Sequence, residues 1–118
     1  LREADDRFRH ICDDLSVKNR VNIEVNQVGL TSSKAMTSTV MEIIEHESQK
    51  LGLDTSSLPS GAGHDAQSMA EITDVGMIFV PSVDGISHSP NEYTTPQACI
   101  NGANVLLNTL LTADQSYN

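Results

Sequence analysis

The sequence is poor in basic residues. Its 118 residues include seven Lys and Arg against sixteen Asp and Glu, which gives a formal net charge of -9. A chain with this charge repels polyphosphate backbones and has no cationic patch to bind them. Nucleic acid is therefore excluded as an expected partner.

Long apolar runs and cysteine pairs are also missing. The longest apolar stretches, GMIFV and ANVLLNTLL, fall well short of the roughly 20 residues that cross a bilayer. The two cysteines, Cys12 and Cys99, lack the spacing of a metal site. No basic and apolar leader opens the sequence. We therefore expect no membrane span, and a cytoplasmic protein whose two thiols are free and buried.

What the sequence does contain is a set of amphipathic helices. Helical spacing of apolar residues predicts a helix over residues 6–16, a second one whose stripe runs from Met36 to Leu51, and a short third one in HDAQSMAEI. Gly52 stands where the second helix would end. A fourth helix should begin with Thr95 as its cap, and its apolar stripe is expected to be Ile100, Ala103, Leu107 and Leu110.

Two segments have the pattern of β-strands. Residues 21–28, VNIEVNQV, alternate apolar and polar side chains, as a half-buried strand does. Residues 77–80 are apolar at every position, which is typical of a central strand covered on both faces. Helices and strands in this order predict an α/β fold.

The stretch SGAGHDA, residues 60–66, is a candidate ligand loop. Gly61 and Gly63 would let a ligand approach the backbone, and the amides that open the next helix favour a carboxylate or phosphate. The alternative interpretation is an ordinary loop in which Asp65 stabilises the first helical turn. A lone Gly-x-Gly does not decide between them.

His88 follows the predicted central strand, in the motif GISHSPNE. In α/β folds, ligands gather beyond the carboxyl ends of strands, and neutral imidazole is a common zinc ligand. Asp84 and Glu92 could each orient its second ring nitrogen. A zinc site needs three or four ligands, however, and the sequence has no H-x-D or H-E-x-x-H motif. A solvated turn histidine is the alternative.

Arg2, which follows what would be the end of a strand, could bind a substrate carboxylate through two parallel hydrogen bonds. A single arginine that faces water is the alternative. His10 and His46 lie among charged residues in predicted helices, where a solvated face explains them.

Taken together, LPSGAGHDAQSMAEITDVGMIFVPSVDGISHSPNEYT and GANVLLNTLL resemble the C-terminal part of the amidase and carbamoylase branch of the zinc-dependent aminoacylase and carboxypeptidase superfamily. This branch includes N-carbamoyl-L-amino acid hydrolases, allantoate amidohydrolases and β-ureidopropionases. The resemblance covers most of residues 33–111. It extends more weakly upstream, where LREADDRF and the next helix and strand resemble the end of a lid or dimerisation domain. It thus implies a lid piece at residues 1–28 and a catalytic piece, a sheet covered by helices, at residues 29–118.

The resemblance also implies roles for individual residues. His88 matches a histidine that binds one of two catalytic metal ions, usually zinc and sometimes manganese or nickel. Gly61, Gly63 and His64 match a loop that lines the substrate site, where a backbone amide contacts the substrate carboxylate. Arg2 matches a lid arginine that grips the same carboxylate, often in an active site shared with a neighbouring subunit. The expected substrate is a small ureido carboxylate, and the expected assembly is a homodimer or other self-association.

This sequence lacks several residues of the family pattern. The H-x-D pair, the Glu-Glu pair and the other metal histidine of the family are absent from this sequence. We therefore expect this chain to be inactive by itself and not to retain the metals. Two alternatives stay open: a noncatalytic binding or assembly module that packs against a partner chain, and a peptidase or N-acyl amino acid hydrolase of the same superfamily.

Overall fold

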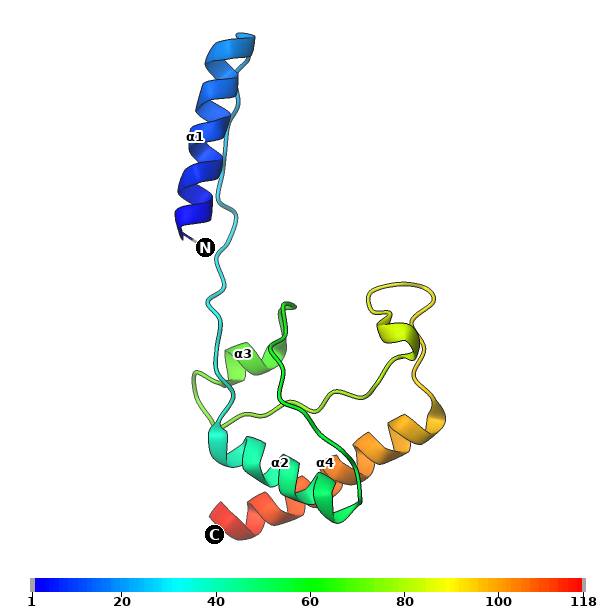
Figure 1. Cartoon of the computed structure of the whole chain (residues 1–118). Coiled ribbons are helices and arrows are strands. Elements are labelled where there is room, and N and C mark those ends of the chain that lie inside the picture. The colour runs from blue at the N-terminus through cyan, green and yellow to red at the C-terminus, as the bar shows by residue number, and fades with distance from the viewer. Residues whose placement is uncertain (1, 118) are drawn as a thin grey trace. The chain divides into compact units, whose positions relative to one another are not determined.

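The computed structural model describes residues 2–117 and divides the chain into two compact units, Leu1–Ser32 and Ser33–Asn118. The helices are α1 (Arg2–Asn19), α2 (Ser38–Lys50), α3 (Asp65–Met69), the short 3-10 helix η1 (Val83–Gly85) and α4 (Pro96–Tyr117) (Figure 1). Across residues 2–117 there is no β-strand, so the predicted sheet is not formed by this chain. In the same residues, no helix combines the length and the apolar character required to cross a membrane. The assignment of the two parts to a lid and a catalytic domain stays a prediction.

The first unit consists of α1 and the segment after it, which runs back along the helix (Figure 1). Arg9 Nη1 donates to the carbonyl oxygen of Val25 at 3.2 Å, and Ser16 Oγ accepts from the amide of Ile23 at 3.2 Å. The helix predicted for residues 6–16 is confirmed and is longer at both ends. The strand predicted for residues 21–28 is wrong for this chain, because the hydrogen bonds of its backbone go to helix α1 and no strand is formed among residues 2–117.

Helix α2 ends as its glycine predicts. Gly52 has a φ of +70°, in the left-handed region that favours glycine. Its amide bonds the carbonyl of Gln49 at 2.9 Å, and the amide of Leu53 bonds the carbonyl of Ser48 at 3.0 Å. This is the Schellman pattern, in which a glycine just past the helix satisfies two of the last carbonyls.

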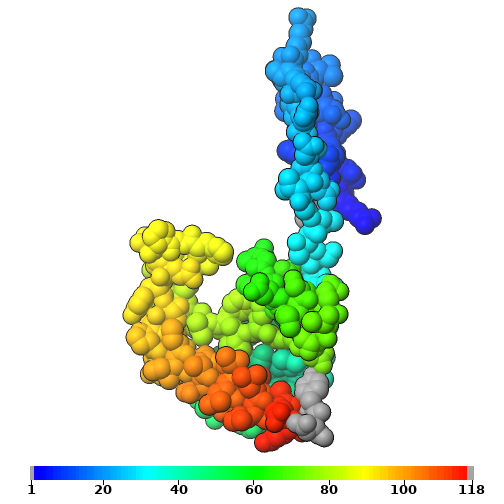
Figure 2. All heavy atoms as spheres, turned by 180° about the vertical axis from the view of Figure 1, so that it is seen from behind, coloured from blue at the N-terminus to red at the C-terminus, as the bar shows by residue number. Residues whose placement is uncertain are grey.

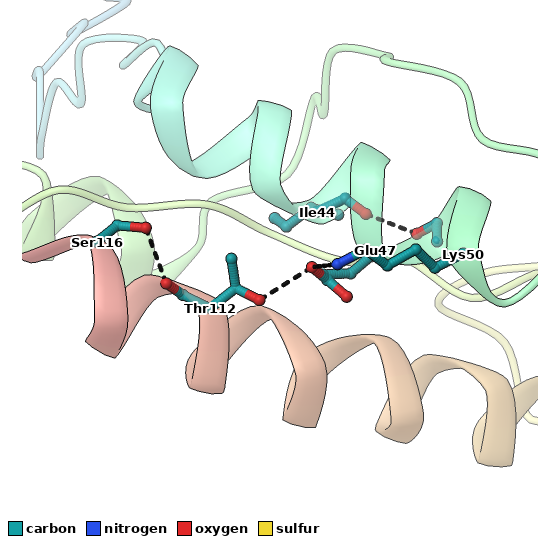
Figure 3. A network of polar contacts seen from close by, with 6 residues as sticks. Ile44, Glu47, Lys50, Thr112 and Ser116 are labelled. Carbon is teal, nitrogen blue, oxygen red and sulfur yellow. Dashed lines mark hydrogen bonds and ion pairs between the residues drawn. The ribbon is translucent and has the colours of Figure 1, made fainter.

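The second unit is held together by the packing of α2 against α4. Val105 of α4 is 3% exposed and Glu47 of α2 is 4% exposed. Thr112 Oγ1 donates to Glu47 Oε1 at 2.9 Å, and Lys50 Nζ donates to the same oxygen at 2.8 Å (Figure 3). These hydrogen bonds, first the one from Lys50 and then the one from Thr112, lower the pKa of the Glu47 carboxyl. The helix pair thus buries a carboxylate that is ionised and partnered, as buried charges usually are.

Helix α4 begins as predicted but turns a different face to the protein. Thr95 Oγ1 accepts from the amide of Ala98 at 3.2 Å, and Pro96 occupies the first turn. The buried residues of α4 are Val105 and Thr109, whereas Leu107 and Leu110 are 56% and 59% exposed. The predicted stripe is therefore on the solvent side in this chain. Apolar spacing marks a face that can be buried, but it does not say whether the covering element is present.

The apolar segment of residues 77–80 lies between α2 and α4 without being a strand. A Cβ on Gly76 would lie 2.6 Å from Val40 Cγ1 of α2, and a Cβ on Gly102 of α4 would lie 2.4 Å from Val80 Cγ1. Only glycine permits these approaches. Thr37, just before α2, anchors the start of the segment, because its amide bonds the carbonyl of Val75 at 2.8 Å and its Oγ1 accepts from the Val75 amide at 3.0 Å.

The strand predicted for residues 77–80 is also not formed, and the reason is local. A strand is defined by ladder hydrogen bonds to a neighbour. Segment 76–80 has helices beside it, and no strand is formed among residues 2–117 with which it could share such bonds. The apolar side chains of residues 77–80 fit a central strand, but the segment has no partner strand within residues 2–117.

Candidate functional site

The glycine loop before α3 is organised around His64. Ser60 Oγ lies 2.8 Å from His64 Nε2, and the His64 ring meets the Phe79 ring edge to face, with centroids 5.6 Å apart. Gln67 Oε1 accepts from the His64 amide at 3.0 Å, while the Gln67 amide bonds the His64 carbonyl at 2.9 Å. The imidazole is therefore fixed from two sides, and the loop carries it against the apolar segment.

Two features of this loop limit the donors that the predicted anion cradle could use, and the cradle stays a prediction. Helix α3 is only five residues long, so few aligned peptide units contribute to its dipole. The amides of Ala62 and His64 already donate to Ser60 Oγ and to Gln67 Oε1. Within residues 2–117, the amides of Gly61 and Gly63 donate no hydrogen bond, and these are the loop donors left for a carboxylate.

His88 lies in a loop closed by the hydrogen bond from the Val83 amide to the Tyr93 carbonyl, 2.8 Å long. Its φ of +55° is in the left-handed region, which costs a non-glycine residue roughly 1–2 kcal/mol. Glu92 Oε2 accepts from the backbone amide of His88 at 2.8 Å. Glu92 thus holds the backbone of His88, whereas the prediction had Glu92 or Asp84 orienting its ring. The side chain of His88 is exposed.

The structure places the two loops on one side of the second unit. The segment around residue 60 and the segment around residue 90 both extend away from the α2 and α4 pair (Figures 1 and 2). In the space-filling view they form two separate projections (Figure 2). Within residues 2–117, no recorded hydrogen bond or ring contact joins His64 to His88. The loops therefore share a side of the unit without forming a closed site.

Arg2 belongs to the first unit, where it opens α1, and its side chain is exposed. The strand that Arg2 was predicted to follow lies outside the described residues, and Arg2 itself is the first described residue of α1. Its proposed role toward a substrate carboxylate stays a prediction.

Metal-binding side chains are not clustered in the part of the chain that the structure describes. Among residues 2–117, no group of three or more His, Cys, Asp or Glu side chains could hold a metal ion. The thiols do not supply one either: Cys12 is buried as predicted, but Cys99 is exposed, contrary to prediction. His88 could be one ligand of a metal ion, and the others would have to come from outside residues 2–117.

Sequence reasoning missed the residues that position His64. Ser60 and Phe79 contact His64, whereas Glu92, which was predicted to orient the His88 ring, holds the His88 backbone. For Ser60 a signal was available, because it lies four residues before His64 inside the same motif. The Phe79 contact joins residues 15 positions apart, and nothing in the spacing indicates it.

Comparison with known proteins shows the family to which the chain belongs. The family model described as Peptidase family M20/M25/M40 matches residues 7–112, which is most of the chain. The chain therefore belongs to this family. No solved structure matches it significantly.

Three of the similar curated proteins are named amidohydrolases. The chain is 45% identical over 74 residues to N-carbamoyl-L-amino acid amidohydrolase of Geobacillus stearothermophilus, covering 63% of this chain and 18% of that protein. It is 34% identical over 92 residues to allantoate amidohydrolase of Escherichia coli (strain K12), covering 78% and 21%. It is 30% identical over 115 residues to N-carbamoyl-L-amino-acid amidohydrolase of Paenarthrobacter aurescens, covering 98% and 28%. The chain thus spans between 18% and 28% of the length of these relatives.

Proposed function

We propose that this chain is the C-terminal portion of a binuclear metal-dependent amidohydrolase that cuts the carbamoyl or ureido C–N bond of a small carboxylate substrate. The observation that carries the proposal is the similarity to relatives whose names specify N-carbamoyl amino acids and allantoate. The finer fold follows from the same proposal: residues 29–118 would complete a sheet covered by helices, and residues 1–28 would end a lid.

His88 is the proposed metal ligand, for zinc or for manganese or nickel. Its imidazole is exposed, and its backbone is held in a left-handed conformation by Glu92. Strained backbone of this kind clusters at ligand sites, where surrounding structure maintains it. One imidazole cannot hold a metal ion tightly, and no group of three metal-binding side chains occurs in residues 2–117. The isolated chain is therefore proposed to be inactive.

The remaining residues are proposed to bind the substrate. Metal ions in such a site polarise the carbonyl group and activate water. In this chain, the free amides of Gly61 and Gly63 would donate to the substrate carboxylate, and His64, fixed by Ser60, would line the same site. Arg2 would add a bidentate contact from the lid.

A second candidate keeps the family and changes the substrate to a peptide or N-acyl amino acid. The observation that favours it is the description of the matching family model, which names peptidases. The loop does not separate the two candidates, because both substrate classes carry a carboxylate.

A chimera tests the proposal. In the Paenarthrobacter aurescens enzyme, the matched 115 residues would be replaced by the corresponding residues of this chain. We expect the chimera to hydrolyse an N-carbamoyl-L-amino acid or allantoate faster than a dipeptide or an N-acetyl amino acid. A preference for the peptide or N-acyl substrate would instead support the second candidate.

Two variants of the chimera test the role of His88. His88→Ala should lower turnover by about 100-fold or more and remove about one metal equivalent, because a ligand is lost. His46→Ala is the matched control, since His46 is an exposed histidine on α2 that has no proposed role. A His88→Ala chimera with full metal content and full activity would overturn the assignment of the ligand.

A further inference from the structure

The hydroxyl group of Ser60 takes part in two hydrogen bonds of the glycine loop. Its Oγ accepts from the amide of Ala62 at 3.3 Å and lies 2.8 Å from Nε2 of His64. A serine hydroxyl has one proton to donate and two lone pairs that accept. The use of the Ser60 proton therefore depends on which nitrogen of the His64 ring carries hydrogen.

The start of α3 indicates which ring nitrogen that is. His64 and Gln67 form a capping box, in which the His64 side chain accepts from the Gln67 backbone and the Gln67 side chain accepts from the His64 amide. Nε2 faces Ser60, so the acceptor in the capping box is the other nitrogen, Nδ1. A neutral imidazole has one acceptor nitrogen and one N–H group. The hydrogen therefore lies on Nε2, which donates to Ser60 Oγ.

This count of donors and acceptors leaves the Ser60 proton free. Both lone pairs of Oγ are taken, one by the Ala62 amide and one by His64 Nε2. Within residues 2–117, the Ser60 hydroxyl then donates to no acceptor, and the residue is exposed. Because two of the tetrahedral directions around Oγ are fixed by these bonds, the O–H bond has a set direction and is a pre-oriented donor.

The loop leaves room for a ligand beside this hydroxyl. A Cβ on Gly61 would meet nothing within 4 Å, and one on Gly63 would meet only Gln67 Oε1 at 3.6 Å, an ordinary contact. Neither glycine has a positive φ. Packing and backbone conformation therefore do not require glycine at either position. The absence of side chains keeps the amides of both residues uncovered next to the Ser60 hydroxyl.

We propose that Ser60 is a substrate-binding residue, whose hydroxyl donates to the substrate carboxylate together with the amides of Gly61 and Gly63. The inference rests on the proposed function, which supplies the carboxylate. An ionised carboxylate has about four lone-pair sites and can accept from all three donors. His64 acts on the carboxylate through Ser60, because its Nε2–H group orients the hydroxyl, and it is therefore a positioning residue.

The first test is the tautomer of His64, which is read in the isolated chain and requires no activity. A long-range proton–nitrogen NMR spectrum at about pH 8, where imidazole is neutral, should show hydrogen on Nε2, with His64→Ala used to assign the ring signals. Hydrogen on Nδ1 would mean that Ser60 donates its proton to Nε2. That result would overturn the proposal, whatever reaction the parent enzyme catalyses.

The second test compares two substrates in the chimera with the Paenarthrobacter aurescens enzyme. Ser60→Ala should raise KM for an N-carbamoyl-L-amino acid about 10- to 100-fold with little change in kcat, because a hydrogen bond to a charged group is lost. For the corresponding carboxamide, which has no carboxylate, the same substitution should raise KM much less. An equal rise for both substrates would mean that Ser60 only shapes the loop, and it would overturn the proposal, as would an unchanged KM.

Two further variants serve as controls. Ser60→Thr keeps the hydroxyl and should restore most of the affinity for the carboxylate substrate. Ser57→Ala removes an exposed serine of the same segment that has no proposed role, and it should change neither KM. If the chimera prefers an N-acyl amino acid, the comparison uses that substrate and its carboxamide. Failure of the proposed ureido hydrolysis is therefore distinct from failure of the role of Ser60.

Discussion

The close packing at Gly102 of α4 predicts the effect of a substitution on stability. A Cβ at this position would lie 2.4 Å from Cγ1 of Val80 and 3.9 Å from its Cβ. Carbon atoms in ordinary contact are about 3.5–4.0 Å apart. Valine is stiff because it branches at Cβ. Gly102→Ala would therefore push α4 and segment 76–80 apart, since the valine cannot turn aside cheaply.

Two opposing effects set the magnitude of this change. Overpacking costs about 1–3 kcal/mol. Alanine in the interior of a helix gains about 1 kcal/mol over glycine. We therefore expect Gly102→Ala to lower the free energy of unfolding of the second unit by about 0–2 kcal/mol. In a Val80→Ala background the clash is absent, and the same substitution should raise it by about 1 kcal/mol.

The assay is a double-mutant cycle in which urea unfolding is followed by circular dichroism. The coupling between Gly102→Ala and Val80→Ala should be about 1–3 kcal/mol, because the overpacking disappears when Val80 is truncated. If Gly102→Ala stabilised the chain equally in both backgrounds, α4 would not approach segment 76–80 as described.

Three further changes test single features of the second unit. The pKa of Glu47 is lowered in the folded state, so its contribution to stability is present above its unfolded pKa of about 4.3 and is lost as pH falls through the lower folded pKa. Glu47→Gln should therefore weaken the loss of unfolding free energy at acid pH. An unchanged loss at acid pH would contradict this. Thr95→Ala should cost about 1 kcal/mol in urea unfolding, because the cap of α4 is lost, and a neutral result would argue against the cap. His88→Gly should raise the free energy of unfolding by about 1 kcal/mol, because glycine relieves the strain of the left-handed backbone. Asp84→Gly should do the same, because Asp84 has a φ of +56°. A loss of stability in His88→Gly would mean that the His88 side chain contributes to packing.

Local signals predicted the helices well. Gly52 ends α2, and Thr95 and Pro96 start α4, because capping depends on residues within one turn of the helix end. The two predicted strands do not form in this chain. Val21 to Val28 and Met77 to Val80 have strand patterns, but a strand exists only when it is paired with another strand, and residues 2–117 form none.

Local signals also located the two loops of the candidate site, but not the contacts between distant segments. The glycine loop and the His88 loop were both found from sequence, and the structure puts them on one side of the second unit. The contact of His64 with Phe79 could not be predicted, because it depends on how the loop folds back on the apolar segment. The ligand set could not be predicted from these residues, since no group of three metal-binding side chains is present among residues 2–117.

Zinc titration of the isolated chain tests the central claim, that His88 is one ligand of a site completed outside this chain. We expect binding no tighter than about micromolar, because apparent free energies of about 10–16 kcal/mol belong to complete structural zinc sites. His88→Ala should lower even this weak affinity, whereas His46→Ala should not. Stoichiometric nanomolar binding by the isolated chain would contradict the account, because it would mean that residues 1–118 assemble a full metal centre.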